Sequence, residues 1–120
     1  MSTGPATSAA TSALSDAEYQ RETSALLARI EAATDRWLQD DVIDIDTQRT
    51  GGLLELSFPD GSKIIINTQP PLHEVWLAAR AGGYHYRCSE GRWLDTRDGS
   101  EFIEALSQHA SAQGSKPLQF

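Results

Sequence analysis

Residues 51–67 read GGLLELSFPDGSKIIIN, and this stretch decides the fold class. Apolar and polar side chains alternate over residues 54–58, as in a strand with one face in the core and the other in water. Residues 63–67 include three consecutive isoleucines and are strongly strand-prone. Between these segments, Pro59-Asp60-Gly61 is a tight-turn sequence. Two strands joined by so short a turn predict an antiparallel hairpin.

Shorter strand-like segments flank this hairpin on both sides. Upstream, Val42-Ile43-Asp44-Ile45-Asp46 alternates strictly, which places the two isoleucines on one face and the two aspartates on the other. Downstream, Val75 and Leu77 share one face, and Trp76 lies on the opposite one. The predicted strands cover residues 42–46, 54–58, 63–67, 73–78, 84–87 and 93–95, with turns or breaks at Gly51-Gly52, Pro70-Pro71 and Gly82-Gly83.

Amphipathic helices are predicted before and after the strands. Residues 16–40 contain neither Gly nor Pro, and Ser15 or Asp16 can cap their N-terminus. Asp98 begins a D-x-x-E capping-box pattern with Glu101 ahead of the second helix. The apolar stripes recur at helical spacing and comprise Tyr19, Leu26, Leu27, Ile30, Ala33 and Trp37 in the first helix and Phe102, Ile103, Leu106 and Ala110 in the second.

The order of these elements predicts an α+β fold. A helix, about six short strands and a second helix show no strand–helix–strand alternation, so a doubly wound parallel sheet is disfavoured. We expect a two-layer α/β sandwich with both helices on one face of an antiparallel sheet whose other face meets water. The domain is expected to span residues 15–113, between a disordered tail at 1–14 and a loosely held end at 114–120.

Composition narrows the classes of function. The chain has 120 residues, enough for one domain, and its 39% hydrophobic and 22% charged residues are typical of a folded globular protein. A net charge of −7 argues against binding to nucleic acid or to an anionic membrane surface. The single cysteine, Cys88, excludes an internal disulfide and a cysteine-rich zinc site.

No targeting signal is recognisable. No apolar run approaches the ~20 residues that span a bilayer. Residues 1–14 carry no charge, whereas a signal peptide needs a basic start and a mitochondrial presequence needs arginines. These features favour the cytoplasm of a bacterium.

Acidic side chains are concentrated in one region, which we call the acidic ridge. Residues 31–46 contain six acids and a single base, Arg36. This pattern fits a solvated face that keeps the protein soluble, and equally a surface that binds hard cations or a basic partner protein. The ridge comprises Glu31, Asp35, Asp40, Asp41, Asp44 and Asp46.

A second candidate surface lies on the face of the sheet that is turned to water. Strand parity places Trp76 there, and exposed large aromatic side chains are frequent binding anchors. The alternative is a tryptophan covered by a loop or by the stems of other side chains. Residues of the neighbouring strands should point to the same side, and we call the resulting group the sheet-surface patch: Asn67, Gln69, Trp76, His85 and Arg87.

The sequence contains none of the common catalytic motifs. There is no G-x-S-x-G, P-loop or G-x-G-x-x-G, and none of the histidines His73, His85 and His109 pairs with another at a metal-ligand spacing. Cys88 has no C-x-x-C partner and is interpreted as a structural thiol. The acids are expected on an exposed convex surface, where no burial would raise a carboxyl pKa for general-acid catalysis. We therefore expect a binding protein and not an enzyme.

Four runs of residues resemble the frataxin family, closest to its bacterial members. They are GGLLEL at 51–56, GSKIIIN at 61–67, NTQPPLHEVWLA at 67–78 and GGYHY at 82–86, and with the acidic first helix the resemblance covers about residues 15–113. The resemblance implies the fold predicted above. It also implies a part in iron–sulfur cluster assembly, in which the protein binds Fe²⁺ or Fe³⁺ weakly and tunes a cysteine desulfurase in response to iron.

The resemblance also implies roles for individual residues. It assigns iron binding to the acidic ridge, namely Glu31, Asp35, Asp40, Asp41, Asp44 and Asp46. It assigns contacts with the cysteine desulfurase and with the scaffold protein of cluster assembly to Glu31, Asp35, Asp41, Asn67, Gln69, Trp76 and His85. The expected state is a monomer, or an oligomer that forms with iron.

The chain departs from the family pattern in the first helix. Ala32, Ala33 and Arg36 stand where relatives commonly carry further acids, and Gln20 stands where some bacterial relatives carry a histidine. Fewer or weaker iron sites are expected as a result. Two alternative functions stay open: a ferroxidase or iron-storage activity at the same ridge, and a protein-interaction module whose metal binding is incidental.

Overall fold

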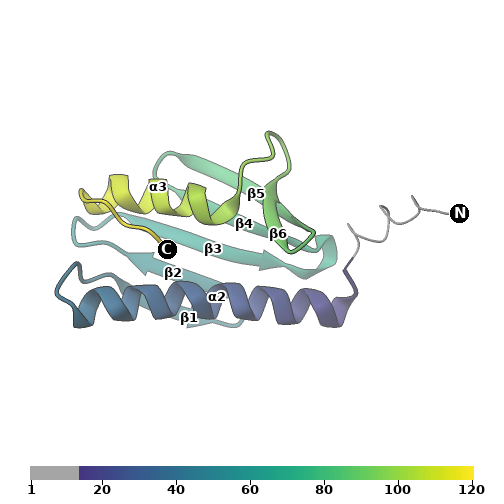
Figure 1. The fold of residues 1–120 in the computed structure, drawn as a ribbon, viewed down its shortest axis with the longest axis horizontal. Helices are drawn as coiled ribbons and strands as arrows, with labels where there is room; N and C mark the ends of the chain where they lie inside the picture. Colours follow the sequence, from purple (N-terminus) through teal and green to yellow (C-terminus); the bar gives the residue numbers. More distant parts are fainter. Residues whose placement is uncertain (1–13) are drawn as a thin grey trace, which may run out of the picture.

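The computed structural model describes residues 14–120, which form a two-layer sandwich of two helices on a six-stranded sheet. Both helices cover the same face of the sheet (Figure 1). The strands follow one another across the sheet in chain order, each antiparallel to the one before, which confirms the predicted fold class. The elements are α2 (Asp16–Gln39), β1 (Asp46–Thr50), β2 (Leu53–Ser57), β3 (Lys63–Gln69), the short 3₁₀ helix η1 (Pro70–Leu72), β4 (Glu74–Ala79), β5 (Gly82–Ser89), β6 (Arg92–Asp95) and α3 (Phe102–Gly114).

The core lies between the helices and the sheet. Alternate residues of each central strand point toward the helices, and the parity predicted for Val75 and Leu77 against Trp76 is confirmed. The other residues of these strands are therefore left on the solvent face. The most deeply buried large side chains, each at most 2% exposed, are Tyr19, Leu27, Ile30, Leu54, Leu56, Ile64, Ile66, Val75, Leu77, Tyr86, Phe102 and Leu106.

Helix α2 begins where the sequence indicates. The Ser15 hydroxyl accepts a hydrogen bond from the Glu18 N–H at 3.1 Å, and the Glu18 carboxylate accepts one from the Ser15 N–H at 2.8 Å. This capping box satisfies two backbone donors at the start of the helix. It also holds the pKa of the Glu18 carboxyl below its usual value.

The strand predicted at residues 42–46 begins later than expected. The N–H groups of Val42 and Ile43 donate to the Trp37 carbonyl, at 2.8 and 3.4 Å, so the chain first folds back over the end of α2. Pairing with β2 starts only at Asp46, opposite Ser57. The predicted alternation of faces nevertheless holds, since Ile43 is buried and Asp44 is exposed.

The cap predicted for the second helix is wrong. Asp98 instead accepts hydrogen bonds from the N–H and the hydroxyl of Ser100, at 2.9 and 2.7 Å, and so closes a turn. Glu101 is the N-cap of α3, and its carboxylate accepts from the Glu104 N–H at 3.1 Å. The helix therefore begins three residues later than an Asp98 cap would allow.

The turn predicted at Gly82-Gly83 also lies elsewhere. Ala79 pairs with Gly82 in the ladder between β4 and β5, so both glycines belong to β5. The hairpin turns at residues 80–81, two positions earlier than the glycines indicated.

Among residues 14–120, no helix combines the length and the apolar character needed to cross a bilayer.

The C-terminal segment is packed and not loosely held. It runs back between α2 and α3 (Figure 1), where Leu118 and Phe120 are buried. The Phe120 N–H donates to the Ser107 hydroxyl of α3 at 3.0 Å, and the Phe120 ring meets the Trp37 indole of α2 edge-on at 4.8 Å. At the other end, Leu14 packs against the core, and the rest of the tail predicted at residues 1–14 lies outside the described residues.

Candidate functional site

The acidic ridge follows the end of α2 and the connection into the sheet. Asp40 is the C-cap of α2, and Asp41 next to it has a left-handed backbone conformation with φ 56°, which Asp tolerates better than most residues. Five of the six side chains are exposed and Glu31 is half-buried. Two acids lie on α2 (Glu31 and Asp35), three in and around the connection (Asp40, Asp41 and Asp44), and one at the start of β1 (Asp46).

Glu31 differs from the other ridge acids because it is paired. Arg49 on β1 donates from Nη1 to Glu31 Oε1 at 2.8 Å. Both side chains are about one-third exposed. The other five carboxylates form no ion pair within residues 14–120, so the uncompensated charge of the ridge rests on Asp35, Asp40, Asp41, Asp44 and Asp46.

The end of α2 adds to this negative potential. The last carbonyl groups of a helix together carry the equivalent of ~0.5 of a negative charge, so carboxylates at this end are unfavourable for helix stability. Asp40 and Asp41 lie there, with Arg36 as the basic residue of the last turn. A cation bound near this end would relieve the repulsion, and carboxylate and carbonyl oxygens are the ligands that hard cations prefer.

The ridge is an open surface and not a preformed cage. Within the part of the chain that the structure describes, no three His, Cys, Asp or Glu side chains lie close enough together to hold a metal ion. A cation there would be held by one or two carboxylates, with water completing its coordination shell. Such a site binds weakly and discriminates little among hard cations.

The sheet-surface patch crosses three neighbouring strands. Trp76 on β4 lies in register between Asn67 on β3 and His85 on β5. The Trp76 indole and the His85 imidazole stack, with ring centroids 4.2 Å apart and planes inclined by 6°. Trp76 is half-buried, whereas His85 and Arg87 are exposed. The predicted placement of Trp76 on the solvent face is thus correct, and part of its covering comes from the His85 ring.

The sequence did not reveal that Glu74 is buried in this patch and contacts three of its side chains. Its side chain is only 8% exposed although it lies on the solvent face of the sheet. Glu74 Oε1 accepts from Trp76 Nε1 at 2.8 Å and lies 3.7 Å from His85 Nδ1, and Oε2 accepts from Arg87 Nε at 3.0 Å. Strand parity places Glu74 beside Trp76, but no sequence pattern indicates that its carboxylate is covered by its neighbours.

A mostly apolar hollow of about 220 Å³ adjoins the patch. A stacked aromatic pair next to such a recess is the kind of surface on which a few residues dominate protein binding. The hollow is lined by Ile65, Asn67, Trp76, Leu77, Ala78, Gly83, Tyr84 and His85.

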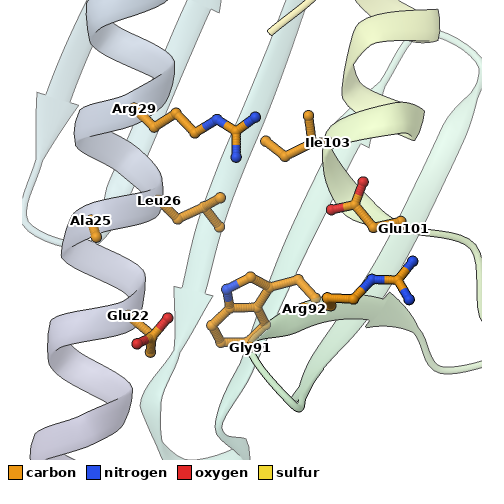
Figure 2. Close-up of a pocket in the computed structure, with 9 residues that line it drawn as sticks. Glu22, Ala25, Leu26, Arg29, Gly91, Arg92, Glu101 and Ile103 are labelled. Carbon is orange, nitrogen blue, oxygen red and sulfur yellow. The ribbon is translucent and has the colours of Figure 1, made fainter.

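A different hollow lies on the helix side of the sheet (Figure 2). Its volume is about 290 Å³, and its rim carries Glu22 and Arg29 from α2, Arg92 from β6 and Glu101 from the cap of α3. Two acids face two bases, so this hollow lacks the one-signed charge of the acidic ridge. It contains none of the site residues predicted from the sequence.

Within residues 14–120, groups suited to nucleophilic or acid–base chemistry are not assembled into a site. Burial raises the pKa of the Cys88 thiol, which disfavours the reactive thiolate. Burial also lowers the pKa of His109, which lies against the Tyr84 ring. His73 is hydrogen-bonded to Asp16 at 2.8 Å, at the opposite end of α2 from the ridge acids.

Comparison with known proteins points to one family. The family model described as a frataxin-like domain matches residues 12–116. The iron–sulfur cluster assembly protein CyaY of Polaromonas sp. (strain JS666 / ATCC BAA-500) is 50% identical over 107 residues, which cover 89% of this chain and 92% of that protein.

Solved structures agree with this result. The frataxin of Psychromonas ingrahamii, a model for stability modulation within the CyaY family, superimposes with a TM-score of 0.77 at 35% identity and covers 88% of this chain and 97% of its own. A trimeric frataxin of Saccharomyces cerevisiae, complexed with ferrous iron, gives a TM-score of 0.67 at 24% identity, with 79% and 87% coverage. The likeness to the yeast protein supports the fold alone.

Proposed function

This chain belongs to the frataxin family, and from that premise we propose that it binds iron and takes part in, and regulates, iron–sulfur cluster assembly. The proposed cargo is Fe²⁺ or Fe³⁺, held on the acidic ridge. The proposed partners are the cysteine desulfurase and the scaffold protein of the assembly machinery. The name of the Polaromonas relative, half identical to this chain, supports the pathway.

The observation that carries the iron-binding proposal is the group of five carboxylates around the end of α2 that have no ion-pair partner among residues 14–120. Fe²⁺ and Fe³⁺ accept oxygen ligands where thiolates and imidazoles are absent, as they are on this ridge. The adjacent carbonyl end of the helix strengthens the attraction for a cation. Neutralising these acids should therefore remove most of the affinity.

The same geometry supports a regulator in preference to an enzyme. An exposed site with one or two protein ligands exchanges its metal rapidly, because water can replace each carboxylate in turn. Rapid exchange suits a protein that senses iron or passes it on. A ferroxidase would instead need closely spaced sites that hold iron through a redox step.

The test replaces the charges of the ridge without changing side-chain size. We expect the triple variant Asp41→Asn, Asp44→Asn, Asp46→Asn to weaken Fe²⁺ binding by about tenfold, or ~1.4 kcal/mol, in anaerobic titration calorimetry. The matched control Glu22→Gln, Glu90→Gln, Glu104→Gln removes three charges from exposed positions outside the ridge. Unchanged iron binding in the ridge variant, or an equal loss in the control, would show that the site is wrongly assigned.

The two alternatives are separated by simple additions to that experiment. Oxygen consumption above the buffer rate, on adding Fe²⁺ in air, would favour a ferroxidase. Equal affinity for the cysteine desulfurase with and without iron would favour an interaction module whose metal binding is incidental.

A further inference from the structure

The carboxylate of Glu74 is buried on a face of the sheet that is otherwise open to water. A buried carboxylate is unfavourable unless it is paired and hydrogen-bonded. Here the compensation comes from the residues of the sheet-surface patch itself: the Trp76 indole N–H at 2.8 Å and the Arg87 guanidinium at 3.0 Å, with the His85 ring at 3.7 Å. Glu74 thus connects three side chains that the sequence presents only as alternate residues on two strands.

These contacts fix the orientation of Trp76. An indole side chain has two rotatable torsions, and a free indole on a sheet surface samples several rotamers. The hydrogen bond to Glu74 holds the indole edge, and the stack with His85, inclined by 6°, holds its face. Both constraints depend on where the Glu74 carboxylate lies, because His85 Nδ1 faces the same Oε1 atom that accepts from Trp76.

The backbone of Glu74 is anchored from the opposite side of the sheet. The buried Tyr19 hydroxyl of α2 donates to the Glu74 carbonyl and accepts from the Gln69 N–H at 2.9 Å. Gln69 is the cross-strand partner of Glu74 and a member of the patch. The position of the carboxylate is therefore set by the core as well as by its neighbours on the surface.

We propose that Glu74 is a positioning residue that holds Trp76 and His85 in one arrangement, so that the sheet-surface patch meets its protein partner already formed. The inference rests on the proposed function in taking that partner to be the cysteine desulfurase. Pre-ordering of an aromatic anchor lowers the conformational entropy lost on binding. Glu74 contributes to affinity through Trp76 and not by a strong contact of its own.

The first test is made on the isolated protein. We expect Glu74→Met, which keeps the length of the side chain but removes both acceptor oxygens, to speed hydrogen exchange of the Trp76 indole N–H by about tenfold and to abolish the Trp76–His85 cross-peaks in NMR spectra. Glu74→Gln retains an oxygen that accepts from the indole and should stay close to the wild type. The matched control is Glu55→Met, which removes an ion pair with Lys63 on the same face of the sheet.

The second test measures affinity for purified cysteine desulfurase in a double-mutant cycle. Glu74→Met should weaken binding by about tenfold in the wild-type background and by less than about twofold in a Trp76→Ala background, because its effect passes through Trp76. Glu74→Gln should restore most of the affinity. Thermal unfolding of each variant checks that it is folded. If Glu74→Met is not folded, Glu74→Val, which also lacks the acceptor oxygens and is well suited to a strand, replaces it in the exchange and binding measurements with the same expected results.

Distinct results bear on this inference and on the proposed function. Unchanged indole exchange in Glu74→Met, or full additivity with Trp76→Ala, would overturn the positioning role. A wild-type chain that fails to bind the desulfurase would overturn the proposed partner, and with it the role of Glu74 in docking. In that case the indole exchange alone decides whether Glu74 fixes Trp76.

Discussion

Arg49 pairs with one of the six carboxylates of the acidic ridge. Its guanidinium lies 2.8 Å from Glu31, while the ridge acids at positions 35, 40, 41, 44 and 46 have no ion-pair partner among the described residues. If the ridge binds iron as proposed, Glu31 should therefore contribute less than its neighbours to the attraction. Arg49 also makes the potential at the remaining carboxylates less negative, because it is a positive charge at the edge of the ridge.

Removal of this positive charge should strengthen iron binding. We expect Arg49→Gln to increase the affinity for Fe²⁺ by about threefold, measured by anaerobic calorimetry, since a charge that is only one-third exposed is only partly screened by water. Stability should fall by less than ~1 kcal/mol, because exposed ion pairs contribute little.

The control for this prediction is Arg80→Gln. It removes the same charge and also breaks a surface pair, between Arg80 and Asp60 at 3.2 Å, but outside the ridge. An equal gain in affinity in both variants would mean that net charge, and not the ridge, governs iron binding.

The exposure of the site residues could be predicted from the sequence, but their pairing could not. Alternation in a strand and periodicity in a helix decide which face a side chain occupies, and this was enough for Asp44 and Trp76. The pair of Arg49 with Glu31 joins residues 18 positions apart and depends on how α2 lies against β1. The burial of Glu74 likewise depends on side chains from a neighbouring strand, which no local pattern specifies.

At the scale of elements, the apolar stripes predicted which segments are helices and strands. The residues at which these elements begin were set by hydrogen bonds that the stripes do not reveal. Residues 42–45 have the alternation of a strand, yet the N–H groups of Val42 and Ile43 donate to the Trp37 carbonyl at the end of α2 and not to a neighbouring strand. Asp98 has the spacing of a cap, yet Ser100 supplies it with closer donors. Capping residues such as Asp also close turns, so their identity alone cannot decide between the two uses.

The C-terminal segment acts as a structural element without being a helix or a strand. We expect Phe120→Ala to lower the free energy of unfolding by about 2 kcal/mol, because the ring is 9% exposed and lies against Trp37 between the two helices. The measurement is equilibrium unfolding in urea. The neighbouring exposed residue offers the control, Gln119→Ala, which loses only a long hydrogen bond of 3.3 Å. Equal stability of the two variants would mean that the segment does not contribute to the core.

At the scale of the whole molecule, the two candidate surfaces differ in the range of their forces. The acidic ridge carries most of an overall charge of −7, and its attraction acts over a Debye length of ~8 Å at physiological salt. The sheet-surface patch acts only on contact. The register across β1, β2 and β3 places Asp46 opposite Lys63, which lies four residues along β3 from Asn67. The ridge residue of β1 and the first patch residue of β3 are thus about 10 Å apart across the sheet and ~13 Å apart along the strands. Under the proposed function, one desulfurase molecule would contact both surfaces.

This difference in range predicts that, in docking on the cysteine desulfurase, the acidic ridge governs the association rate and the sheet-surface patch governs the dissociation rate. Raising the salt concentration from ~0.05 to ~0.3 M should slow association several-fold, because steering by the ridge is screened, and should leave dissociation nearly unchanged. The triple Asn variant of the ridge should associate slowly at all salt concentrations, whereas Trp76→Ala should associate normally and dissociate faster. Surface plasmon resonance at a series of salt concentrations measures both rates. Association that is independent of salt in the wild type would leave the sheet-surface patch as the whole of the docking surface, and the ridge as a surface for iron alone.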